Sequence, residues 1–277
     1  MPADPTSETA YAKINLALHV RGRRTDGYHD LETLFAFVDA GDTLTAVEAE
    51  HFSLTVTGPF AAALAGETDN LVLRAARLMA KYNGITTGLA FTLDKHLPIA
   101  SGIGGGSADA AAALRLATRI WGPHRVTWRA SDFDAELGAD VPACGLSRTC
   151  FGSGVGDRVV DFAIDGLAGA PVLLVNPQVA CPTGPVFRRW DGIDQGPLDP
   201  VHWLDARNDL EAPAIALVPV IGDVLNALRQ TGARVTRMSG SGATCFALFD
   251  YAVGRDRAAR QIMADHPEWW TLCGNLR

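Results

Sequence analysis

The amino-acid sequence predicts an α+β protein built from two domains. With 277 residues the chain is longer than one average domain. Its hydrophobic content of 48% and charged content of 20% are typical of a globular protein with a sizeable core. The first half is rich in strand-like alternation, whereas helical and strand-like segments are mixed in the second. We place the boundary near Gly166, which gives domains 1–165 and 166–277.

The first predicted strand, Ala12–Val20, alternates its side chains with the period of two that a strand requires. One face carries Ile14, Leu16, Leu18 and Val20, and the other carries Lys13, Asn15 and His19. Further strands are predicted at Leu31–Val38, Thr43–Val47 and Phe52–Val56, with a polar turn at Asp39–Asp42 between the first two.

Helical periodicity appears first at Asn70–Tyr82 and again at Ser107–Trp121, and a predicted strand, Leu89–Leu93, lies between the two. A short helix with Ser131 as its N-cap is expected at about Ser131–Leu137. The remaining predicted elements are a bent strand or hairpin at Phe151–Arg158, a strand at Pro171–Asn176, a loop at Gly192–Asp205, helices at Leu210–Leu217 and Ile221–Gln230, strands at Val235–Met238 and Thr244–Leu248, a helix at Arg255–Ala264, and a strand at about Trp269–Cys273.

Composition argues against several classes of protein. A net charge of -7 disfavours nucleic acid or an anionic membrane as the main partner. The five cysteines are odd in number and contain no Cys-x-x-Cys pair, which favours reduced thiols over a disulfide framework or a zinc site. The first ten residues resemble no targeting peptide, and the apolar run Ala212–Ile221 is too short to span a bilayer. We therefore expect a cytoplasmic protein.

A glycine loop before a helix is the most informative motif. Four glycines lie between Gly102 and Gly106, and Ser107 and an alanine-rich helix follow them. Glycines let backbone N–H groups converge on an anion, and a helix start adds unpaired donors. The loop therefore predicts a phosphate site, and a flexible turn before a packed helix is the alternative.

The spacing of this loop excludes two common phosphate loops. A P-loop needs a lysine after its last glycine, and none follows here. A dinucleotide fingerprint needs a third glycine where this chain has Ser107.

Two charged residues are candidates for the chemistry of phosphoryl transfer. Lys13 lies on an otherwise apolar strand, and Asp140 lies between Gly138 and Pro142. An aspartate can take the proton from a hydroxyl that attacks a phosphate, and a lysine can neutralise charge on that phosphate. Each residue also has a plain structural interpretation, Lys13 as a surface-seeking strand lysine and Asp140 as a turn or cap residue.

A second glycine loop, Met238–Thr244, separates two predicted strands. It is either a simple hairpin turn or a segment that brings backbone amides and the Ser239 or Ser241 hydroxyl to the same nucleotide.

These motifs, in this order, resemble the galactokinase, homoserine kinase, mevalonate kinase and phosphomevalonate kinase (GHMP) superfamily. Within it, the chain is similar to the family of 4-diphosphocytidyl-2-C-methyl-D-erythritol kinases. The likeness covers nearly the whole sequence. Its most specific motifs are Ala12-Lys-Ile-Asn-Leu16 and Asp26-Gly-Tyr-His29, and the others are Asp69–Ala76, Gly138–Pro142, Gly154–Gly156, Asn208–Leu210 and Ser239–Gly242.

The resemblance implies a GHMP-kinase-like fold, with a first half like domain 2 of ribosomal protein S5 and a ferredoxin-like second half. It implies transfer of the ATP γ-phosphate to the 2-hydroxyl of the methylerythritol unit, in the non-mevalonate route to isoprenoid precursors. ATP and Mg²⁺ are the implied cofactors. The residues it implies are Lys13 and Asp140 for catalysis, Pro98, Ile99, Ala100, Ser101, Gly102, Ile103, Gly104, Gly105, Gly106, Ser107 and Ala108 for ATP, and Asn15, Tyr28, His29 and Phe187 for the cytidyl substrate.

Two positions depart from the family pattern. Ile103 stands where leucine is usual, and Ala108 where a second serine is frequent, so Ser107 is the one loop hydroxyl after the glycines. No acidic residue is evident as a dedicated metal ligand, and Asp109 is expected to stabilise the helix start. Without the resemblance, Tyr28 and His29 would be interpreted as a surface turn.

We expect a small-molecule substrate, with no nucleic acid, membrane or obligate protein partner. Three alternatives remain at this point: a homoserine-type or mevalonate-type kinase, a nucleotide-binding regulator without catalysis, and a dinucleotide-dependent oxidoreductase.

Overall fold

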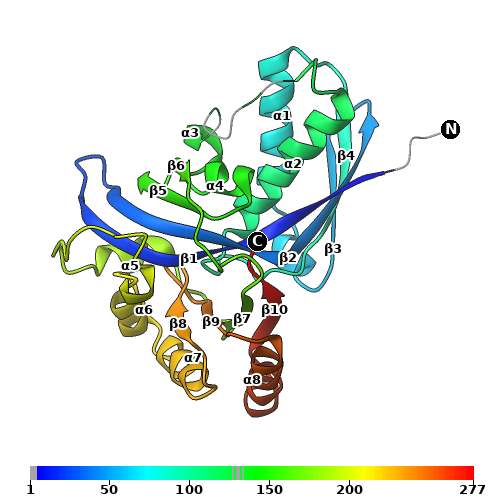
Figure 1. The fold of residues 1–277 in the computed structure, drawn as a ribbon. Helices are drawn as coiled ribbons and strands as arrows, with labels where there is room; N and C mark the ends of the chain where they lie inside the picture. Colours follow the sequence, from blue (N-terminus) through cyan, green and yellow to red (C-terminus); the bar gives the residue numbers. More distant parts are fainter. Residues whose placement is uncertain (1–4, 127, 129–131, 133) are drawn as a thin grey trace. The chain divides into compact units, whose positions relative to one another are not determined.

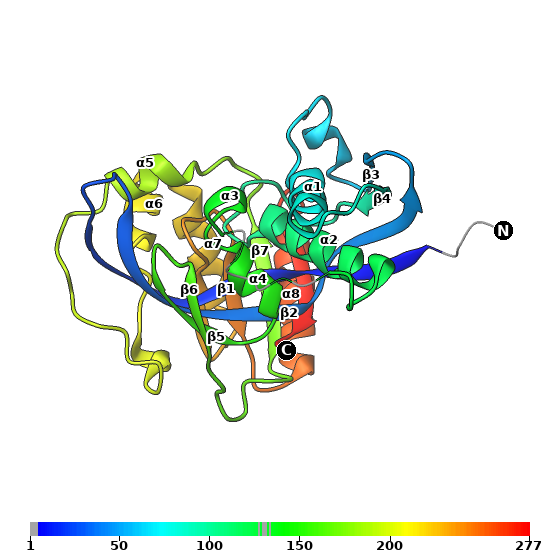
Figure 2. The same cartoon turned by 90° about the horizontal axis from the view of Figure 1, so that it is seen from above.

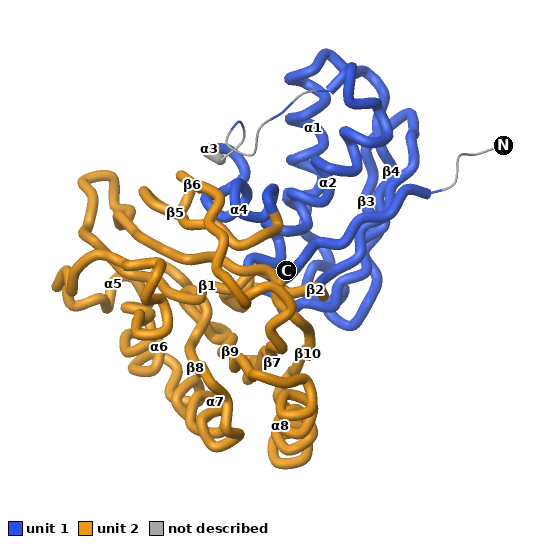
Figure 3. Tube along the Cα trace, in the orientation of Figure 1, with its two compact units in different colours: residues 1–12, 41–99, 104–146 blue, residues 13–40, 100–103, 147–277 orange. Residues whose placement is uncertain are grey.

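A computed structural model describes residues 5–126, 128, 132 and 134–277, and Figure 1 traces its elements. By their contacts the residues form two compact units, shown in Figure 3. Unit 1 consists of residues 1–12, 41–99 and 104–146, and unit 2 consists of residues 13–40, 100–103 and 147–277. Both units contain residues from before Gly166, so the boundary expected there stays a prediction about the sequence domains.

Two long strands, β1 (Thr6–Arg23) and β2 (His29–Ala49), each contribute residues to both units. The strands predicted in these ranges are confirmed, but the turn predicted at Asp39–Asp42 is wrong, because β2 runs through it without interruption. Gly41 has a different reason to be glycine. An added Cβ would lie 1.9 Å from the Ala10 carbonyl oxygen, so its bare backbone permits the close approach of β1.

In unit 1, the second part of β2 pairs antiparallel with β4 (Gly88–Asp94), which pairs in parallel with β3 (Ser53–Thr57). Helices α1 (Leu71–Asn83) and α2 (Gly105–Trp121) lie side by side, as Figures 1 and 2 show. The smaller elements are η1 (Ala61–Leu64), α3 (Asp134–Leu137) and α4 (Val141–Leu146). The expected N-cap Ser131 lies outside the described residues.

Local signals define the ends of α1. The Asn70 side chain caps the helix by accepting a hydrogen bond from the Val72 N–H at 2.9 Å. Gly84, at φ +65°, ends it in the left-handed conformation that glycine adopts readily.

In unit 2, the first part of β2 pairs with β5 (Cys150–Gly154), which forms the predicted hairpin with β6 (Arg158–Asp161). A second sheet is antiparallel throughout, with the strand order β10-β7-β9-β8. Its strands are β7 (Pro171–Asn176), β8 (Val235–Met238), β9 (Cys245–Leu248) and β10 (Trp270–Asn275).

Helices α7 (Val220–Arg229) and α8 (Ala252–Asp265) pack against this sheet (Figure 1). The order strand, helix, strand, strand, helix, strand is that of a ferredoxin-like unit, so this expectation is confirmed. Between β7 and α7 lie α5 (Thr183–Arg188), η3 (Trp203–Asp205) and α6 (Glu211–Leu217).

Within the described residues, no helix is both long and apolar enough to cross a membrane. The five cysteines are free thiols in the structure, and four of them are buried.

The close approach at Gly41 gives a first testable prediction. Gly41→Ala forces a methyl group into backbone atoms, so we expect it to lower the free energy of unfolding by on the order of 3 kcal/mol. Urea denaturation of the two proteins measures this difference. Gly22→Ala is the matched control. Gly22 lies in the other long strand, β1, and no atom would lie within 4 Å of its added Cβ, so this variant should change the free energy of unfolding little. Equal stability of the two variants would contradict the steric explanation.

Candidate functional site

Lys13 and Asn15 form a buried pair in unit 2, on the face of β1 where the sequence predicts them. The Lys13 ammonium donates a hydrogen bond of 2.9 Å to Asn15 Oδ1. Asn15 Nδ2 in turn donates to the Thr33 hydroxyl at 2.8 Å, and that hydroxyl donates to the Ala17 carbonyl at 2.7 Å. These bonds orient the Asn15 amide with its oxygen toward Lys13, so the ammonium is held in one place.

Lys13 also lies 5.1 Å from the centre of the Phe35 ring, within the range of a cation–π contact. Its side chain is buried. The surface-seeking lysine, which was the alternative for this position, is therefore excluded.

The first glycine loop is divided between the two units. Pro98, Ile99 and the segment 104–108 belong to unit 1, whereas residues 100–103 belong to unit 2. Gly102 and Gly104 have φ values of +78° and +64°, which explains glycine at both positions. Gly104 is the N-cap of α2 and has no side chain with which to cap the first N–H groups. A helix start of this kind fits a phosphate.

The second glycine loop packs against the first within unit 2. Met238 and Cys245 are paired at its base, so it is a hairpin turn. It is also more than a turn, because the Ser239 hydroxyl donates to the Gly102 carbonyl at 2.8 Å and accepts from the Asn15 N–H at 3.1 Å. The Thr244 N–H donates to the Ser101 carbonyl at 3.1 Å.

The fit between the two loops depends on Gly102. A Cβ added there would lie 2.5 Å from the Ser239 carbonyl oxygen and 2.7 Å from that of Gly242. Ser239 thus joins β1 to both glycine loops.

The Asn208 side chain holds the second glycine loop by hydrogen bonds to its backbone. Its Nδ2 donates to the Met238 and Gly240 carbonyls, both at 2.8 Å, and its Oδ1 accepts from the Leu210 N–H at 3.0 Å. The motif around Asn208 is visible in the sequence, but its function as a brace is not, because the loop that it holds is about thirty residues away.

Asp140 lies in unit 1, immediately before α4. Its backbone carbonyl accepts from the Cys144 N–H at 3.0 Å, so it stands at the first turn of that helix. Gly138, two residues earlier, has φ +113° and sets the direction of the chain there. Asp140 and Lys13 belong to different units.

Two of the predicted aromatic residues in unit 2, His29 and Phe187, form a cluster, and Tyr28 directly precedes His29 in the chain. Tyr28, in the turn between β1 and β2, is 65% exposed, and its N–H donates to Asp26 Oδ1 at 3.0 Å. The His29 ring lies 4.9 Å from the Phe187 ring, centre to centre. Burial, and then the positive charge of Arg23, lower the pKa of His29, which keeps its imidazole neutral at pH 7.

Sequence reasoning missed two members of this cluster. Trp190 meets His29 edge-on at 5.7 Å, and Arg23 donates to the Trp190 carbonyl at 2.8 Å. That hydrogen bond ties the segment after α5 to β1 and so keeps Phe187 beside His29. The signal available in the sequence was Trp190 itself, a second large aromatic residue three positions after Phe187.

No group of three or more His, Cys, Asp or Glu side chains within the described part of the chain could hold a metal ion. Asp109 is buried and bonded to Lys95 at 2.6 Å, which leaves it poorly placed as a metal ligand. A magnesium ion accompanying ATP would therefore be bound mainly by phosphate and water oxygens. The loop hydroxyl that could join them is that of Ser107, directly after the glycines.

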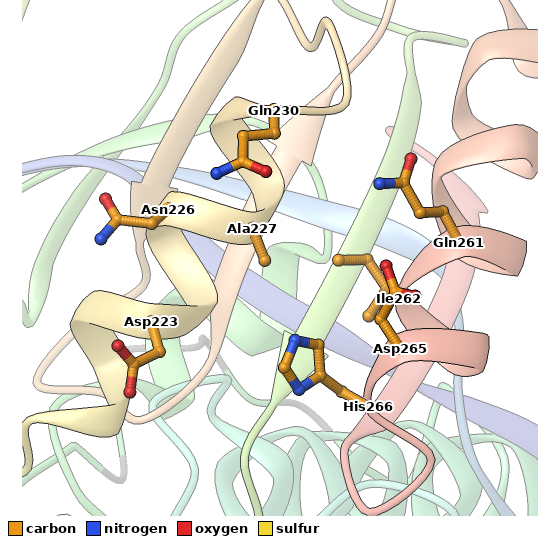
Figure 4. A pocket seen from close by; sticks show the side chains of 8 residues that line it. All are labelled: Asp223, Asn226, Ala227, Gln230, Gln261, Ile262, Asp265 and His266. Atoms are coloured by element: carbon orange, nitrogen blue, oxygen red, sulfur yellow. The ribbon is translucent and has the colours of Figure 1, made fainter.

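Unit 2 also has a polar hollow of about 230 Å³ between α7 and α8, shown in Figure 4. Asp223, Asn226 and Gln230 line it from α7, and Gln261 and Asp265 line it from α8, with His266 directly after that helix. None of the predicted site residues lines this hollow.

Two family models match the chain. The GHMP kinases N terminal domain matches residues 70–148, and the GHMP kinases C terminal domain matches residues 198–267.

Similar proteins extend the match to the full length. The 4-diphosphocytidyl-2-C-methyl-D-erythritol kinase of Rhizorhabdus wittichii is 55% identical over 100% of this chain and 96% of its own. That of Novosphingobium aromaticivorans is 55% identical over 98% of this chain and 92% of its own.

Solved structures agree with these relatives. A crystal structure of 4-(cytidine 5'-diphospho)-2C-methyl-D-erythritol kinase matches with a TM-score of 0.83 and 33% identity, covering 98% of this chain and 99% of that one. The homoserine kinase from Cytophaga hutchinsonii, 16% identical, matches with a TM-score of 0.73 over 99% of this chain and 95% of its own, which shows a shared fold.

The hydroxyl of Ser239 gives the second prediction. Ser239→Ala removes the group that bonds Asn15 and Gly102, and it leaves a buried N–H and a carbonyl without this partner. We expect the free energy of unfolding to fall by about 1–3 kcal/mol. Denaturant titration measures it, and Ser53→Ala on the exposed face of β3 is the control. A Ser239→Ala protein as stable as the control would remove Ser239 as the link between the loops.

Proposed function

This chain belongs to the 4-diphosphocytidyl-2-C-methyl-D-erythritol kinase family of the GHMP kinases, and on that premise we propose how its own residues catalyse the reaction. It is an ATP-dependent kinase. It phosphorylates the 2-hydroxyl of 4-diphosphocytidyl-2-C-methyl-D-erythritol, an intermediate of the non-mevalonate route to isoprenoid precursors. One observation supports the site most strongly: Lys13 is a buried, oriented ammonium on β1, and this strand bonds both glycine loops, through the Lys13 N–H to the Ile103 carbonyl and the Asn15 N–H to the Ser239 hydroxyl.

The first glycine loop, Pro98–Ala108, is proposed to hold the ATP phosphates. The start of α2 offers backbone N–H groups and the positive end of the helix dipole to an anion. The positive φ of Gly104 sets the direction of the chain as it enters that helix. The Ser239 bond to Gly102 fixes the middle of the loop before the nucleotide arrives. A pre-formed set of donors is worth more to a transition state than one that must first rearrange.

Lys13 and Asp140 are the proposed catalytic residues. The 2-hydroxyl oxygen attacks the γ-phosphorus, the bond from that phosphorus to the β-γ bridging oxygen breaks, and ADP leaves. Asp140 takes the hydroxyl proton, and Lys13 balances negative charge on the transferring phosphoryl group. Asn15 keeps the Lys13 ammonium in one orientation, which spares the reaction the cost of ordering that side chain.

The cluster of His29 and Phe187, together with the exposed Tyr28, is proposed to bind the cytidyl group. Pyrimidine rings stack on aromatic faces, and their polar edge needs fixed donors and acceptors. The exposed ring of Tyr28 suits stacking, and the neutral imidazole of His29 offers one donor and one acceptor. Trp190 contacts the His29 ring edge-on, and Arg23 bonds the Trp190 carbonyl, so these two residues keep the cluster in place.

Mg²⁺ is proposed to accompany ATP and, when bound, to neutralise charge on its phosphates. The chain would contribute the Ser107 hydroxyl. The bond from Lys95 to Oδ2 of Asp109 makes that carboxylate a less suitable ligand than Ser107. A cytoplasmic location, and action without an obligate protein partner, remain proposals made from the sequence.

The alternative substrates are disfavoured. The acceptor substrate of a homoserine or mevalonate kinase carries no nucleobase, so Tyr28 and the cluster around Phe187 would have no pyrimidine to bind there. A regulator without catalysis would not require the bonded pair Lys13 and Asn15. An ADP-release assay with the cytidyl alcohol, mevalonate and homoserine in parallel separates these cases.

Asp140→Asn tests the proposed base. The amide cannot accept the proton, so we expect kcat to fall by about 10²–10⁴-fold while the melting temperature and the affinity for the cytidyl alcohol stay close to wild type. Coupled ADP release measures kcat, a thermal melt measures the melting temperature, and calorimetric titration measures the affinity. Asp165→Asn, an exposed aspartate before β7, is the control. Near-normal turnover of Asp140→Asn would show that another group is the base.

Tyr28→Ala and Phe187→Ala test the cytidyl pocket. Stacking of a base on an aromatic ring contributes about 1–3 kcal/mol, so each variant should raise KM for the cytidyl alcohol by about 5–150-fold and leave KM for ATP unchanged. Tyr82→Ala is a matched control, because Tyr82 and Tyr28 are both 65% exposed. A KM for the cytidyl alcohol as low as that of the control would place the nucleobase elsewhere.

A further inference from the structure

Three charged side chains are buried together in unit 1, beside the glycine loop but outside the proposed catalytic residues. Asp42 lies in β2, Lys95 follows the last residue of β4, and Asp109 lies in the second turn of α2. Their exposed fractions are 0%, 1% and 3%. The Lys95 ammonium lies 2.6 Å from Asp42 Oδ2 and 2.6 Å from Asp109 Oδ2.

Asp42 fixes the segment that leads into the loop. Its Oδ1 accepts hydrogen bonds from the backbone N–H groups of His96, at 2.5 Å, and Leu97, at 2.8 Å. The Lys95 N–H donates to the Thr57 carbonyl at 2.9 Å. The three residues before Pro98 are therefore bonded to β2 and to the end of β3, which leaves this arm of the loop little freedom.

Asp109 and Gly105 fix the other arm. The bond from Lys95 to Asp109 joins the same ammonium to α2. A Cβ added at Gly105 would lie 3.2 Å from Lys95 Nζ and 3.7 Å from the Leu97 Cβ. The first turn of α2 thus rests directly on the lysine, and a side chain at residue 105 would separate them.

Stability alone does not explain this cluster. Burying two carboxylates and one ammonium has a large desolvation cost, and an apolar trio of similar volume is often as stable. The charges are also unequal, with one positive and two negative. Burial, opposed by Lys95 and reinforced by Asp42, raises the pKa of Asp109 to about 7. Its Oδ1 is buried without a hydrogen-bond partner among the described residues.

We propose that Asp42, Lys95 and Asp109 are positioning residues that set the two arms of the phosphate loop, so that the N–H groups at the start of α2 meet the ATP phosphates. One ammonium contacts both arms at once, and this geometry is what distinguishes the cluster from an ordinary ion pair. The inference rests on the proposed binding of ATP by Pro98–Ala108.

Lys95→Met is the first test. We expect KM for ATP to rise at least about tenfold, as for a lost charge-assisted contact, with KM for the cytidyl alcohol unchanged. Lys81→Met, an exposed lysine of α1, is the control. A folded Lys95→Met enzyme with the KM of the control for ATP overturns the proposal.

Asp109→Asn decides the question if Lys95→Met does not fold, because its carboxamide keeps an acceptor for Lys95 but loses the charge that ties the ammonium to α2. We expect KM for ATP to rise by at least about threefold, as for a charge-assisted bond that becomes a neutral one, with KM for the cytidyl alcohol unchanged. A folded Asp109→Asn enzyme with the wild-type KM for ATP overturns the proposal.

Gly104→Val separates this inference from the proposed loop function. If Gly104→Val leaves KM for ATP unchanged, the loop does not bind ATP and the inference fails with it. If Gly104→Val raises KM while Lys95→Met and Asp109→Asn do not, the loop function stands and the positioning function of the cluster is overturned.

Discussion

The candidate site depends on one buried hydroxyl. Ser239 accepts from the β1 backbone at Asn15 and donates to the first glycine loop at Gly102, so a strand and two loops share a single atom. Glycine loops have much conformational freedom and lose it on folding. Because the bond from Ser239 to Gly102 forms in the protein without any ligand, the loop is already ordered when the nucleotide binds. Asn208 adds to the same effect by holding the second loop through two carbonyls.

Much of the site could be predicted from the sequence because its signals are local. Strand alternation alone places Lys13 and Asn15 on one face of β1, and glycine spacing alone identifies the turn before α2. The functions of Thr33 and Ser239 could not be predicted in this way. Each acts through a partner that is close only in the folded chain, so no spacing in the sequence reveals it.

Asp42 shows why the one wrong turn was predicted. An aspartate beside a glycine is typical of a turn, because its side chain bonds nearby backbone. Here the carboxylate instead bonds Lys95, 53 residues further along the chain. Such a side chain can bond either the nearby backbone or a partner that is distant in sequence. At Asp42 the distant partner Lys95 takes the carboxylate, and the backbone stays in a strand. The same competition applies to Asp109, which was expected to serve only the helix start and also binds a lysine.

Gly41 has a consequence for how tolerance to mutation is interpreted. It touches no ligand and performs no chemistry, yet the carbonyl of Ala10 leaves no room for another side chain. In a survey of random variants scored by growth, Gly41 and Asp140 would be equally intolerant. Only a parallel measurement of protein abundance separates a residue that the fold requires from one that the reaction requires.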